Sequence, residues 1–291
     1  MKLYSPKTIN QIKDLFGFKF SKSLGQNFLT DYNIIQKIAE GSNIGEEDLV
    51  VEIGPGIGVI TAECCQRAKK VVAIELDRNL LPVLNYTLAE YNNVKVINGD
   101  VLKTDINEII EKEGFKKAKI IGNLPYYITT PIIMQLLENH VNAESITVMM
   151  QKEVADRIKS APGKKTYGAI SVAVQYYCTV ETVTDVSKEV FMPKPKVDST
   201  VLRLDLREEP PVKLINRDVF FQCVKKGFGQ RRKTLLNALN GIRGMDKEQI
   251  KECLCSASID PGRRAETLSI EEFAELSNKI CEKEVEYGEN S

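Results

Sequence analysis

The fold of this chain is decided by the stretch DLVVEIGPGIG, which occupies residues 48–58. Its apolar part, Leu49 to Ile53, is typical of a buried strand, and the glycines that follow allow a tight turn. Helical spacing begins at Val59, and the first turn of a helix presents free N–H groups to a ligand. A strand, a glycine-rich turn and a helix in this order predict a nucleotide-type binding loop in an α/β fold.

The glycine spacing favours one class of ligand. A dinucleotide fingerprint would have its third glycine at the position that Val59 occupies. The spacing from Glu52 through Gly54 and Gly56 to Gly58 instead follows the Glu-x-Gly-x-Gly-x-Gly pattern of enzymes that use S-adenosylmethionine (SAM). The alternative is a plain turn that binds nothing.

Two acidic residues at later strand ends support the SAM interpretation. The apolar run 70–74 ends at Glu75, about twenty residues past the loop, where a carboxylate can accept hydrogen bonds from both ribose hydroxyls. The run 94–99 ends at Asp100, which is placed to accept from the adenine amino group of the cofactor. Either could be a surface acid, but open α/β sheets bind ligands at the carboxyl ends of their parallel strands.

A fourth strand end carries the tetrapeptide NLPY, Asn123 to Tyr126, directly after the apolar run 119–122. An amide beside an aromatic ring suits a planar base with an exocyclic amine, whose lone pair is delocalised into the ring. Hydrogen bonds from that amine to the Asn123 side-chain oxygen and a backbone carbonyl would favour a pyramidal nitrogen, and Tyr126 could stack on the base. The alternative is an ordinary strand-to-turn junction.

Together these motifs resemble the ribosomal RNA adenine N6-dimethyltransferases, and most closely the bacterial branch that acts on 16S RNA. The resemblance implies a SAM-dependent enzyme that dimethylates two adjacent adenosines in the hairpin loop near the 3′ end of 16S RNA and assists small-subunit maturation. It covers almost the whole chain in order. The motifs that carry it are LGQNFL (residues 24–29), the glycine loop, Glu75, Asp100, NLPY (123–126) and FMPKPKVDS (191–199).

The resemblance also implies roles for single residues. The Leu124 carbonyl would share the target amine with Asn123, and Tyr126 and Phe191 would sandwich the flipped adenine. Phe191 has an alternative role as a core anchor for the Pro-x-Pro loop that follows it. We expect direct in-line methyl transfer without a covalent intermediate. The residues assigned to SAM are Asn27, Leu29, Gly54, Gly56, Glu75, Asp100 and Asn123.

The order of elements predicts two domains. Alternating strands and helices indicate a seven-stranded Rossmann-like sheet with helices on both faces, in a domain that spans residues 1–207. Its basic N-terminal segment, residues 1–30, contains the GQNFL motif. Charge and two prolines follow at 208–211, and residues 208–291 show helical spacing without a convincing strand. The strands are expected near 48–53, 70–74, 94–99, 119–122, 145–150, 180–186 and 197–206.

Charge is segregated along the chain, although 40 basic and 40 acidic residues give a net charge of zero. The stretch 219–245 holds six basic residues and no acid, and the N-terminal stretch is also basic. Phosphate binding needs a local basic cluster, so we expect RNA contacts here, with a solvated helix face as the alternative. The residues assigned to RNA are Lys22, Lys225, Lys226, Arg231, Arg232 and Lys233.

The remaining inventory argues against other chemistries. His140 is the single histidine, which leaves no His-rich metal site or His-based triad, and the seven cysteines show no zinc-finger spacing. We therefore expect no metal. Free thiols, together with the lack of a signal peptide, a lipidation motif or a membrane-spanning run, predict a cytoplasmic protein. We also expect a monomer with no membrane partner.

Two further functions remain open. One is the related resistance class that methylates an adenine of large-subunit (23S) RNA, since it shares the catalytic motifs. The other is a non-catalytic RNA-binding assembly factor on the same fold. The intact Gly54, Glu75, Asp100 and Asn123 argue against loss of catalysis, and the N-terminal segment and helical domain favour the 16S type. A NAD-dependent oxidoreductase is disfavoured by Val59.

Overall fold

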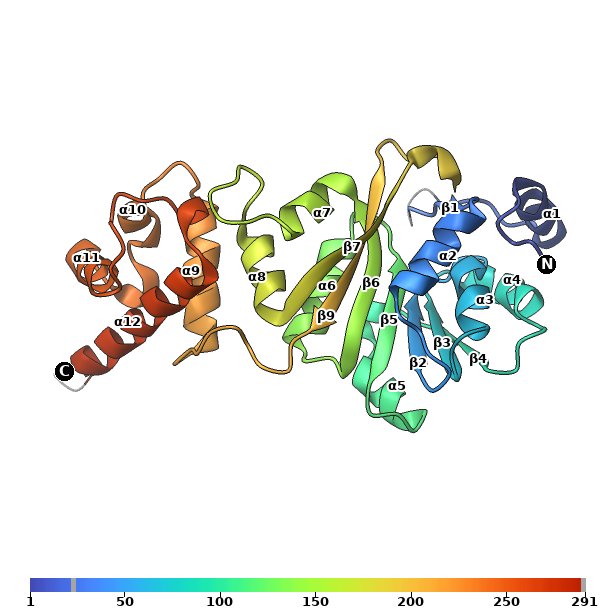
Figure 1. Ribbon diagram of the computed structural model, residues 1–291, viewed down its shortest axis with the longest axis horizontal. Coiled ribbons are helices and arrows are strands. Elements are labelled where there is room, and N and C mark those ends of the chain that lie inside the picture. Colours follow the sequence, from blue (N-terminus) through green and yellow to red (C-terminus); the bar gives the residue numbers. More distant parts are fainter. Residues whose placement is uncertain (22–24, 289–291) are drawn as a thin grey trace. The chain divides into compact units, whose positions relative to one another are not determined.

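The computed structural model describes residues 1–21 and 25–288 of the chain. Contacts between residues divide it into two compact units (Figure 1). The first unit comprises Met1–Ala155 and Thr179–Leu206 and contains the large sheet. The second comprises Asp156–Cys178 and Arg207–Ser291, and its described elements are helices.

A seven-stranded sheet forms the centre of the first unit, as predicted, in the order β4-β3-β2-β5-β6-β9-β7. The strands from β2 to β6 pair in parallel, and β9 runs antiparallel to β6. The order reverses at β2, which pairs with β3 on one side and β5 on the other. The bounds are β2 (Leu49–Ile53), β3 (Lys70–Glu75), β4 (Val94–Asn98), β5 (Ala118–Asn123), β6 (Ala143–Gln151), β7 (Cys178–Val186) and β9 (Ser199–Leu206).

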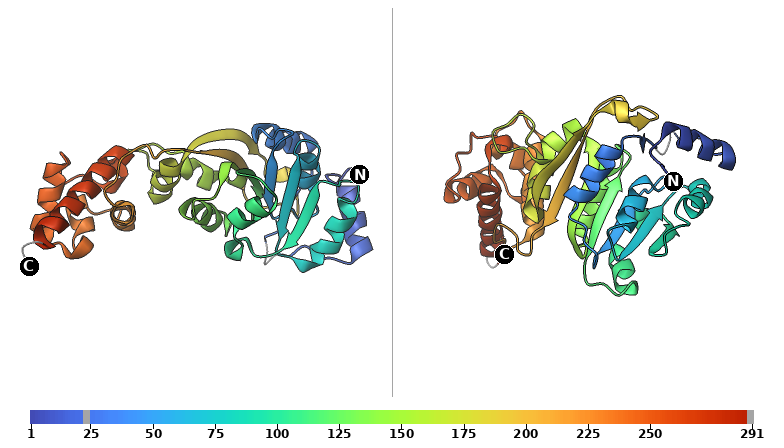
Figure 2. Two further views of the ribbon diagram at one scale, coloured as in Figure 1. Left: turned by 90° about the horizontal axis from the view of Figure 1, so that it is seen from below. Right: turned by 45° about the vertical axis from the view of Figure 1, so that its right-hand side comes forward.

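Helices cover both faces of this sheet (Figure 2). All five residues of β2 are buried, which explains why its sequence is a continuous apolar run interrupted only by Glu52. The helices and short 3₁₀ turns of this unit are α2 (Tyr32–Gly41), α3 (Val59–Cys65), η1 (Arg78–Leu80), α4 (Leu81–Thr87), η2 (Val101–Lys103), α5 (Ile106–Lys112), α6 (Thr129–Glu138), the start of α7 (Lys152–Ile158), which belongs to the second unit from Asp156 onward, and η3 (Lys188–Val190).

The N-terminal segment adds two elements that the sequence did not predict. Helix α1 (Pro6–Phe16) comes first, and β1 (Phe28–Leu29) pairs antiparallel with β8 (Phe191–Met192) in a separate two-stranded sheet. The pairing joins the GQNFL motif to the FMPKPKVDS motif, with Leu29 opposite Phe191. Two motifs more than 160 positions apart in the sequence therefore lie side by side.

The second unit has a hydrophobic core of its own, built around Tyr167, Phe220 and Phe273. Residues 156–178 belong to this unit, whereas the predicted domain boundary at 207 leaves them with the sheet. The reason is packing, because Tyr167 and Tyr176 lie in the core of the helical unit. Its elements are α8 (Ala169–Tyr177), α9 (Arg217–Gly229), α10 (Leu235–Leu239), η4 (Ile242–Gly244), α11 (Lys247–Ser256), η5 (Ala265–Thr267) and α12 (Ile270–Gly288).

The N-terminal segment also packs against the glycine loop. A Cβ atom added to Gly56 would lie 2.7 Å from Cε1 of Phe28, whose side chain is buried in the core. Gly56 and Gly54 both have positive φ, but a Cβ on Gly54 would have no heavy atom within 4 Å. Glycine is therefore required at position 56 both for its positive φ and for the lack of space for a Cβ atom. At position 54 it is required only for the positive φ.

We predict that Gly56→Ala destabilises the protein more than Gly54→Ala. Both variants incur about 1–2 kcal/mol for left-handed backbone, and the overlap with Phe28 adds about 1–3 kcal/mol in Gly56→Ala alone. Denaturant unfolding of both variants measures the difference. The Gly56→Ala/Phe28→Ala double variant should show a favourable coupling energy, and equal destabilisation of the two single variants would contradict the packing argument.

Candidate active site

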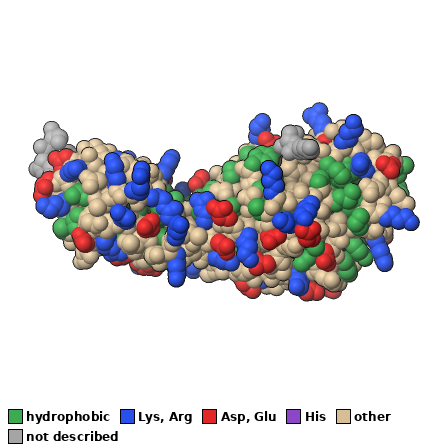
Figure 3. Space-filling model, turned by 90° about the horizontal axis from the view of Figure 1, so that it is seen from above, with side chains coloured by type: hydrophobic (Ala, Val, Ile, Leu, Met, Phe, Trp, Pro, Cys, Tyr) green, Lys and Arg blue, Asp and Glu red, His purple; other side chains and the backbone are tan. Residues whose placement is uncertain are grey.

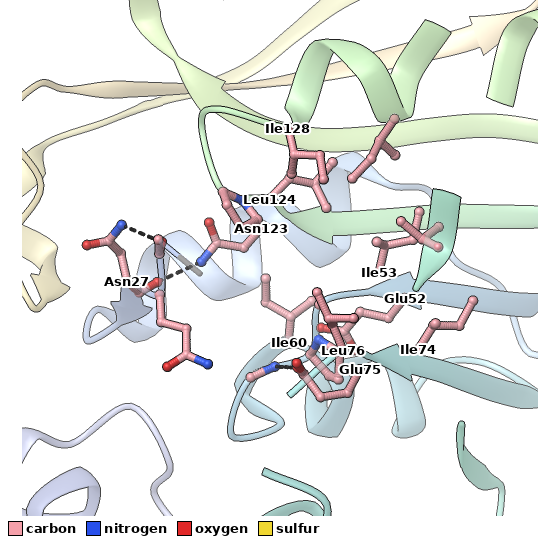
Figure 4. A pocket seen from close by; sticks show the side chains of 18 of the residues that line it. Asn27, Glu52, Ile53, Ile60, Ile74, Glu75, Leu76, Asn123, Leu124 and Ile128 are labelled. Atoms are coloured by element: carbon pink, nitrogen blue, oxygen red, sulfur yellow. Dashed lines mark hydrogen bonds between the residues drawn. The ribbon is translucent and has the colours of Figure 1, made fainter. Parts of the chain in front are cut away.

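A pocket lies at the carboxyl ends of β2, β3 and β5 and beside the N-terminal segment (Figure 4). Its empty space, counted together with space open to solvent, is about 1070 Å³. The structure brings these predicted site residues together in its lining: Asn27, Leu29, Gly54, Gly56, Glu75, Asp100, Asn123, Leu124 and Tyr126.

The Asn123 amide is oriented by a hydrogen bond to the N-terminal segment. Its Nδ2 donates to the backbone carbonyl of Asn27 at 3.0 Å, and the Asn27 side chain in turn donates to the carbonyl of Gly25 at 3.0 Å (Figure 4). Because Nδ2 is engaged, Oδ1 is the atom of Asn123 that can accept from a ligand. The Leu124 carbonyl next to it accepts no hydrogen bond within the described residues. Two acceptors are therefore available at the end of β5.

Tyr126 is anchored by its hydroxyl group. Its oxygen lies 2.7 Å from Oγ of Ser199 at the start of β9, and burial raises the pKa of the phenol above its ordinary value. The ring remains part of the pocket lining. A hydroxyl held in this way restricts the swing of the side chain about its Cα–Cβ bond, which suits a stacking surface.

Phe191 does not line the pocket. Its side chain is 5% exposed and lies in the core cluster of the first unit. The structure thus brings Tyr126 to the pocket without Phe191, and the pairing of β8 with β1 accounts for the burial of Phe191. Its place in an aromatic sandwich stays a prediction.

Glu75 is held by two backbone N–H groups. Gly56 N donates to Oε2 at 3.1 Å and Asp77 N donates to Oε1 at 2.8 Å. Burial raises the pKa of the Glu75 carboxyl, while these two hydrogen bonds oppose the shift. Each carboxylate oxygen has a further lone pair directed to other donors, so the group is oriented and still able to accept from a diol.

Asp100 serves first as the cap of η2. Its Oδ1 accepts from Leu102 N at 3.1 Å, and Lys103 Nζ lies 3.8 Å from Oδ2. Since the carboxylate also lines the pocket, Oδ2 is the oxygen that can accept from an amino group of a ligand.

Gln26 is a site residue that sequence reasoning missed. Its Nε2 donates to Oδ2 of Asp77 at 3.0 Å, and its Oε1 accepts from Ser21 N at 2.9 Å. These bonds tie the N-terminal segment to the loop after Glu75. The signal was present in the GQNFL motif, but the partner Asp77 is 51 positions away and only the fold shows the contact.

Glu52 is the second missed residue, although it stands inside the glycine pattern. Its side chain is 1% exposed, lines the pocket, and has no hydrogen-bond partner for Oε2 among the described residues. Burial raises the pKa of the Glu52 carboxyl to about 8, and the nearby charge of Glu75 adds to the shift. An orphaned, buried carboxyl oxygen needs a ligand donor or cation to satisfy it.

These features fit SAM. The molecule carries an ammonium and a sulfonium cation, a ribose diol and an adenine amino group. The pocket offers the Glu52 carboxyl, the Glu75 carboxylate, the Asp100 carboxylate and a glycine loop without Cβ atoms at Gly54 and Gly56. The donor and acceptor chemistry of the two sides is complementary.

The predicted RNA-binding residues differ in their surroundings. Lys225, Arg232 and Lys233 are exposed, and their side chains form no hydrogen bond or ion pair with described residues. Lys226 donates to the Asn240 carbonyl at 2.8 Å, and Lys22 lies outside the described residues. Figure 3 shows Lys and Arg side chains gathered over the helical unit.

Arg231 is used within the helical unit itself. Its guanidinium donates to the backbone carbonyls of Lys165 at 2.8 Å and Tyr167 at 3.1 Å, and lies 3.5 Å from the Glu266 carboxylate. The contacts hold the loop before α8 against the turn after α9. Arg231 therefore has a structural role besides the predicted RNA contact.

The described residues lack two features, a metal-binding group and a membrane-spanning helix. No three His, Cys, Asp or Glu side chains in residues 1–21 and 25–288 are grouped as metal ligands would be. Over the same residues, no helix combines the length and apolar character needed to cross a membrane.

We predict that Glu52→Gln removes a pH dependence of stability. Between pH 4.5 and 8 the unfolded chain releases the Glu52 proton while the folded protein keeps it, so the wild type loses stability as the pH rises. In denaturant unfolding, the free energy of unfolding of the variant relative to that of the wild type should increase by up to about 1.4 kcal/mol per pH unit across this window. The exposed Glu46→Gln is the control, and parallel pH profiles for wild type and Glu52→Gln would refute the assignment.

Comparison with known proteins agrees with this geometry. Residues 17–282 match the family model of ribosomal RNA adenine dimethylases. "Ribosomal RNA small subunit methyltransferase A" of Alkaliphilus metalliredigens is 51% identical over 282 residues, covering 96% of this chain and 98% of the relative. The protein of the same name from Clostridioides difficile is 51% identical over 280 residues, covering 96% and 97%.

Solved structures resemble the whole chain less closely. A dimethyladenosine transferase from Plasmodium falciparum has a TM-score of 0.76 at 26% identity and covers 88% of this chain and 98% of its own. The 23S rRNA methyltransferase ErmE has a TM-score of 0.67, also at 26% identity, and covers 87% and 99%. The family match, the full-length relatives and the site geometry agree, and this chain belongs to the ribosomal RNA adenine dimethylase family.

Proposed function

We propose that this protein uses SAM to dimethylate N6 of two adjacent adenosines in the 3′-terminal hairpin loop of 16S ribosomal RNA. The orientation of Asn123 carries the proposal, because the Asn27 carbonyl holds Nδ2 and leaves Oδ1 as an acceptor at the pocket. The names of the full-length relatives, which specify the small subunit, support the choice of RNA.

The chain's acceptors would raise the reactivity of the target amine. Asn123 Oδ1 and the Leu124 carbonyl would each accept one N–H bond and draw the nitrogen toward a pyramidal geometry. Leu124 is 2% exposed, so these hydrogen bonds would form away from water and gain strength from the low dielectric. The nitrogen lone pair would then point at the methyl donor.

Base stacking would position the adenine. Tyr126, anchored on Ser199, is the proposed stacking surface, and Phe191 is its proposed counterpart on the opposite face once a base enters. Stacking of this kind contributes about 1–3 kcal/mol per base, which helps offset the cost of flipping the nucleotide.

The cofactor side of the pocket would be held by carboxylates. Glu75 would accept from the ribose hydroxyls, Asp100 from the adenine amino group, and Asn27 and Leu29 would close the pocket from the N-terminal segment. When bound, SAM supplies a methyl group activated by the sulfonium. No general base is assigned, because a methylated amine becomes acidic enough to release its proton to water, and positioning supplies the catalysis.

The 23S alternative is not favoured. The solved structure of ErmE and that of the Plasmodium falciparum dimethyladenosine transferase are equally identical to this chain, so those two structures do not separate the functions. The distinction comes from relatives at 50–51% identity over nearly full length, which carry the small-subunit name. Measuring turnover distinguishes a non-catalytic assembly role from 16S methylation and from 23S methylation.

The proposal includes the setting of the reaction. The partner would be 16S RNA within the small ribosomal subunit, which places the reaction in the cytoplasm and links it to small-subunit maturation. The seven cysteines are all free thiols, which agrees with a reducing compartment. We propose that the enzyme acts as a monomer without a metal.

Methyl transfer to ribosomal particles tests the proposed function directly. Labelled SAM is incubated with small subunits from a strain that lacks the modification, and large-subunit RNA is assayed in parallel with product mapping by mass spectrometry. Dimethyladenosine confined to the 3′-terminal hairpin of 16S RNA is the expected result. Label in large-subunit RNA would assign the 23S function, and SAM binding without transfer to either would assign an assembly role.

We predict that Asn123→Ala lowers kcat by at least about 100-fold while SAM binding changes little. The variant loses the acceptor for the target amine but none of the carboxylates on the cofactor side. Single-turnover kinetics and calorimetry separate the two effects. The control is Asn139→Ala, which changes an exposed asparagine directly after α6. If Asn123→Ala keeps the turnover of the wild type, Asn123 does not have the proposed role.

We predict that Arg232→Glu/Lys233→Glu weakens RNA binding about tenfold or more and lowers its salt dependence. These two exposed residues give a cleaner test than Arg231, whose reversal would also break its bonds to Lys165 and Tyr167. Filter binding over a salt series measures both effects. The control is Lys116→Glu/Lys117→Glu, which makes the same change of charge just before β5, at the ends of the strands opposite the pocket. If RNA binding by both variants has the same salt dependence, residues 232 and 233 belong to a solvated face.

A further inference from the structure

Two neighbouring tyrosines occupy the centre of one turn at the pocket. Ile128 N donates to the Pro125 carbonyl at 3.0 Å, so Tyr126 and Tyr127 are the two central residues of a hydrogen-bonded turn. Thr129 Oγ1 also donates to the Pro125 carbonyl at 3.0 Å and ties the turn to the start of α6. Both tyrosines line the pocket, and the turn that carries them is held at both ends.

The two rings differ in exposure and in partners. Tyr126 is partly buried and its hydroxyl is engaged with Ser199. Tyr127 is 61% exposed, and among the described residues its ring stacks on no other ring and its hydroxyl forms no hydrogen bond. An aromatic ring exposed beside a pocket keeps apolar surface that a bound planar group can bury.

The other exposed tyrosines of the described chain each contact another aromatic ring. Tyr32 stacks on Tyr4 with ring centroids 5.0 Å apart, and Tyr86 contacts Phe16 at 5.5 Å. Tyr127 is more exposed than either, at 61% against 38% and 47%. The difference indicates that Tyr127 serves a ligand and not the fold.

The N-terminal segment comes close to one edge of the Tyr127 ring. A Cβ atom on Gly25 would lie 3.6 Å from Tyr127 Cε1 and 3.1 Å from Cβ of Pro125, and Gly25 has a φ of +60°. Glycine thus lets the segment approach the turn closely. The segment lies beside that edge of the ring, and the large exposed area of the ring remains available to a planar group.

We propose that Tyr127 stacks on the nucleotide that neighbours the flipped adenosine. The inference rests on the proposed function and assigns a second base-binding surface next to the pocket. Its occupant is a purine of the same RNA loop, because successive nucleotides lie within reach of adjacent residues and an aromatic ring offers a sequence-tolerant stacking surface. The second adenosine of the substrate pair would lie on Tyr127 while the first is in the pocket.

A tryptophan substitution gives a direct readout, since the chain has no tryptophan of its own. Tyr127→Trp should show fluorescence quenching on addition of a hairpin RNA whose loop contains two adjacent adenosines. Quenching should fall when the neighbour of the target adenosine is replaced by an abasic site. Tyr86→Trp, at an exposed tyrosine of α4, is the matched control and should show no change that depends on the abasic site.

Kinetics with small subunits provides the second test. Tyr127→Ala should raise KM for the particle about tenfold and reduce the share of product in which both adenosines are dimethylated, whereas Tyr127→Phe should stay within about twofold of the wild type. SAM binding and thermal stability of Tyr127→Ala should match the wild type, because the side chain has no partner in the described structure.

Clear outcomes separate this proposal from the proposed function. If the wild type transfers no methyl group to adenosine, the proposed function fails whatever Tyr127 does. If the wild type is active but quenching does not depend on the neighbouring base, and Tyr127→Ala keeps the wild-type KM and product distribution, the stacking role of Tyr127 alone is overturned. A loss in Tyr127→Phe equal to that in Tyr127→Ala would likewise overturn it in favour of the hydroxyl.

Discussion

The parallel pairing of β2 with both β3 and β5 is the constraint on which the site depends. It reverses the strand order at β2 and brings the glycine loop, Glu75 and Asn123 to one edge of the sheet. Parallel strands need crossover helices, which bury both faces and leave the carboxyl ends as the place where polar groups can meet a ligand. Cofactor chemistry and base chemistry therefore share one pocket.

The N-terminal segment completes that pocket through three separate contacts. The Asn27 carbonyl orients the Asn123 amide, Phe28 packs where Gly56 has no Cβ, and β1 pairs with β8. Each contact joins a motif later in the chain to residues that precede the large sheet. The segment thus acts on the cofactor side and the base side of the site at once.

Burial gives the site its chemical character. The Glu52 carboxyl oxygen without a partner and the raised pKa of Glu75 both cost stability in the empty protein, and a cationic ligand with hydroxyl donors would relieve both. At the surface, the exposed ring of Tyr127 beside the pocket keeps apolar area that a bound planar group can bury. The two carboxyls and the ring therefore each have surroundings that a ligand would improve.

The sheet, the helical C-terminal part and most of the pocket lining could be predicted from the amino-acid sequence, because apolar runs, glycine spacing and strand-end acids are local patterns. The roles that depend on distant partners became visible only in the folded chain. The pairing of Leu29 with Phe191, the bonds of Arg231 to Lys165 and Tyr167, and the grouping of residues 156–178 with the helical unit are examples. Such contacts join residues far apart in the chain, and side-chain burial follows from packing in three dimensions, which spacing along one dimension does not encode.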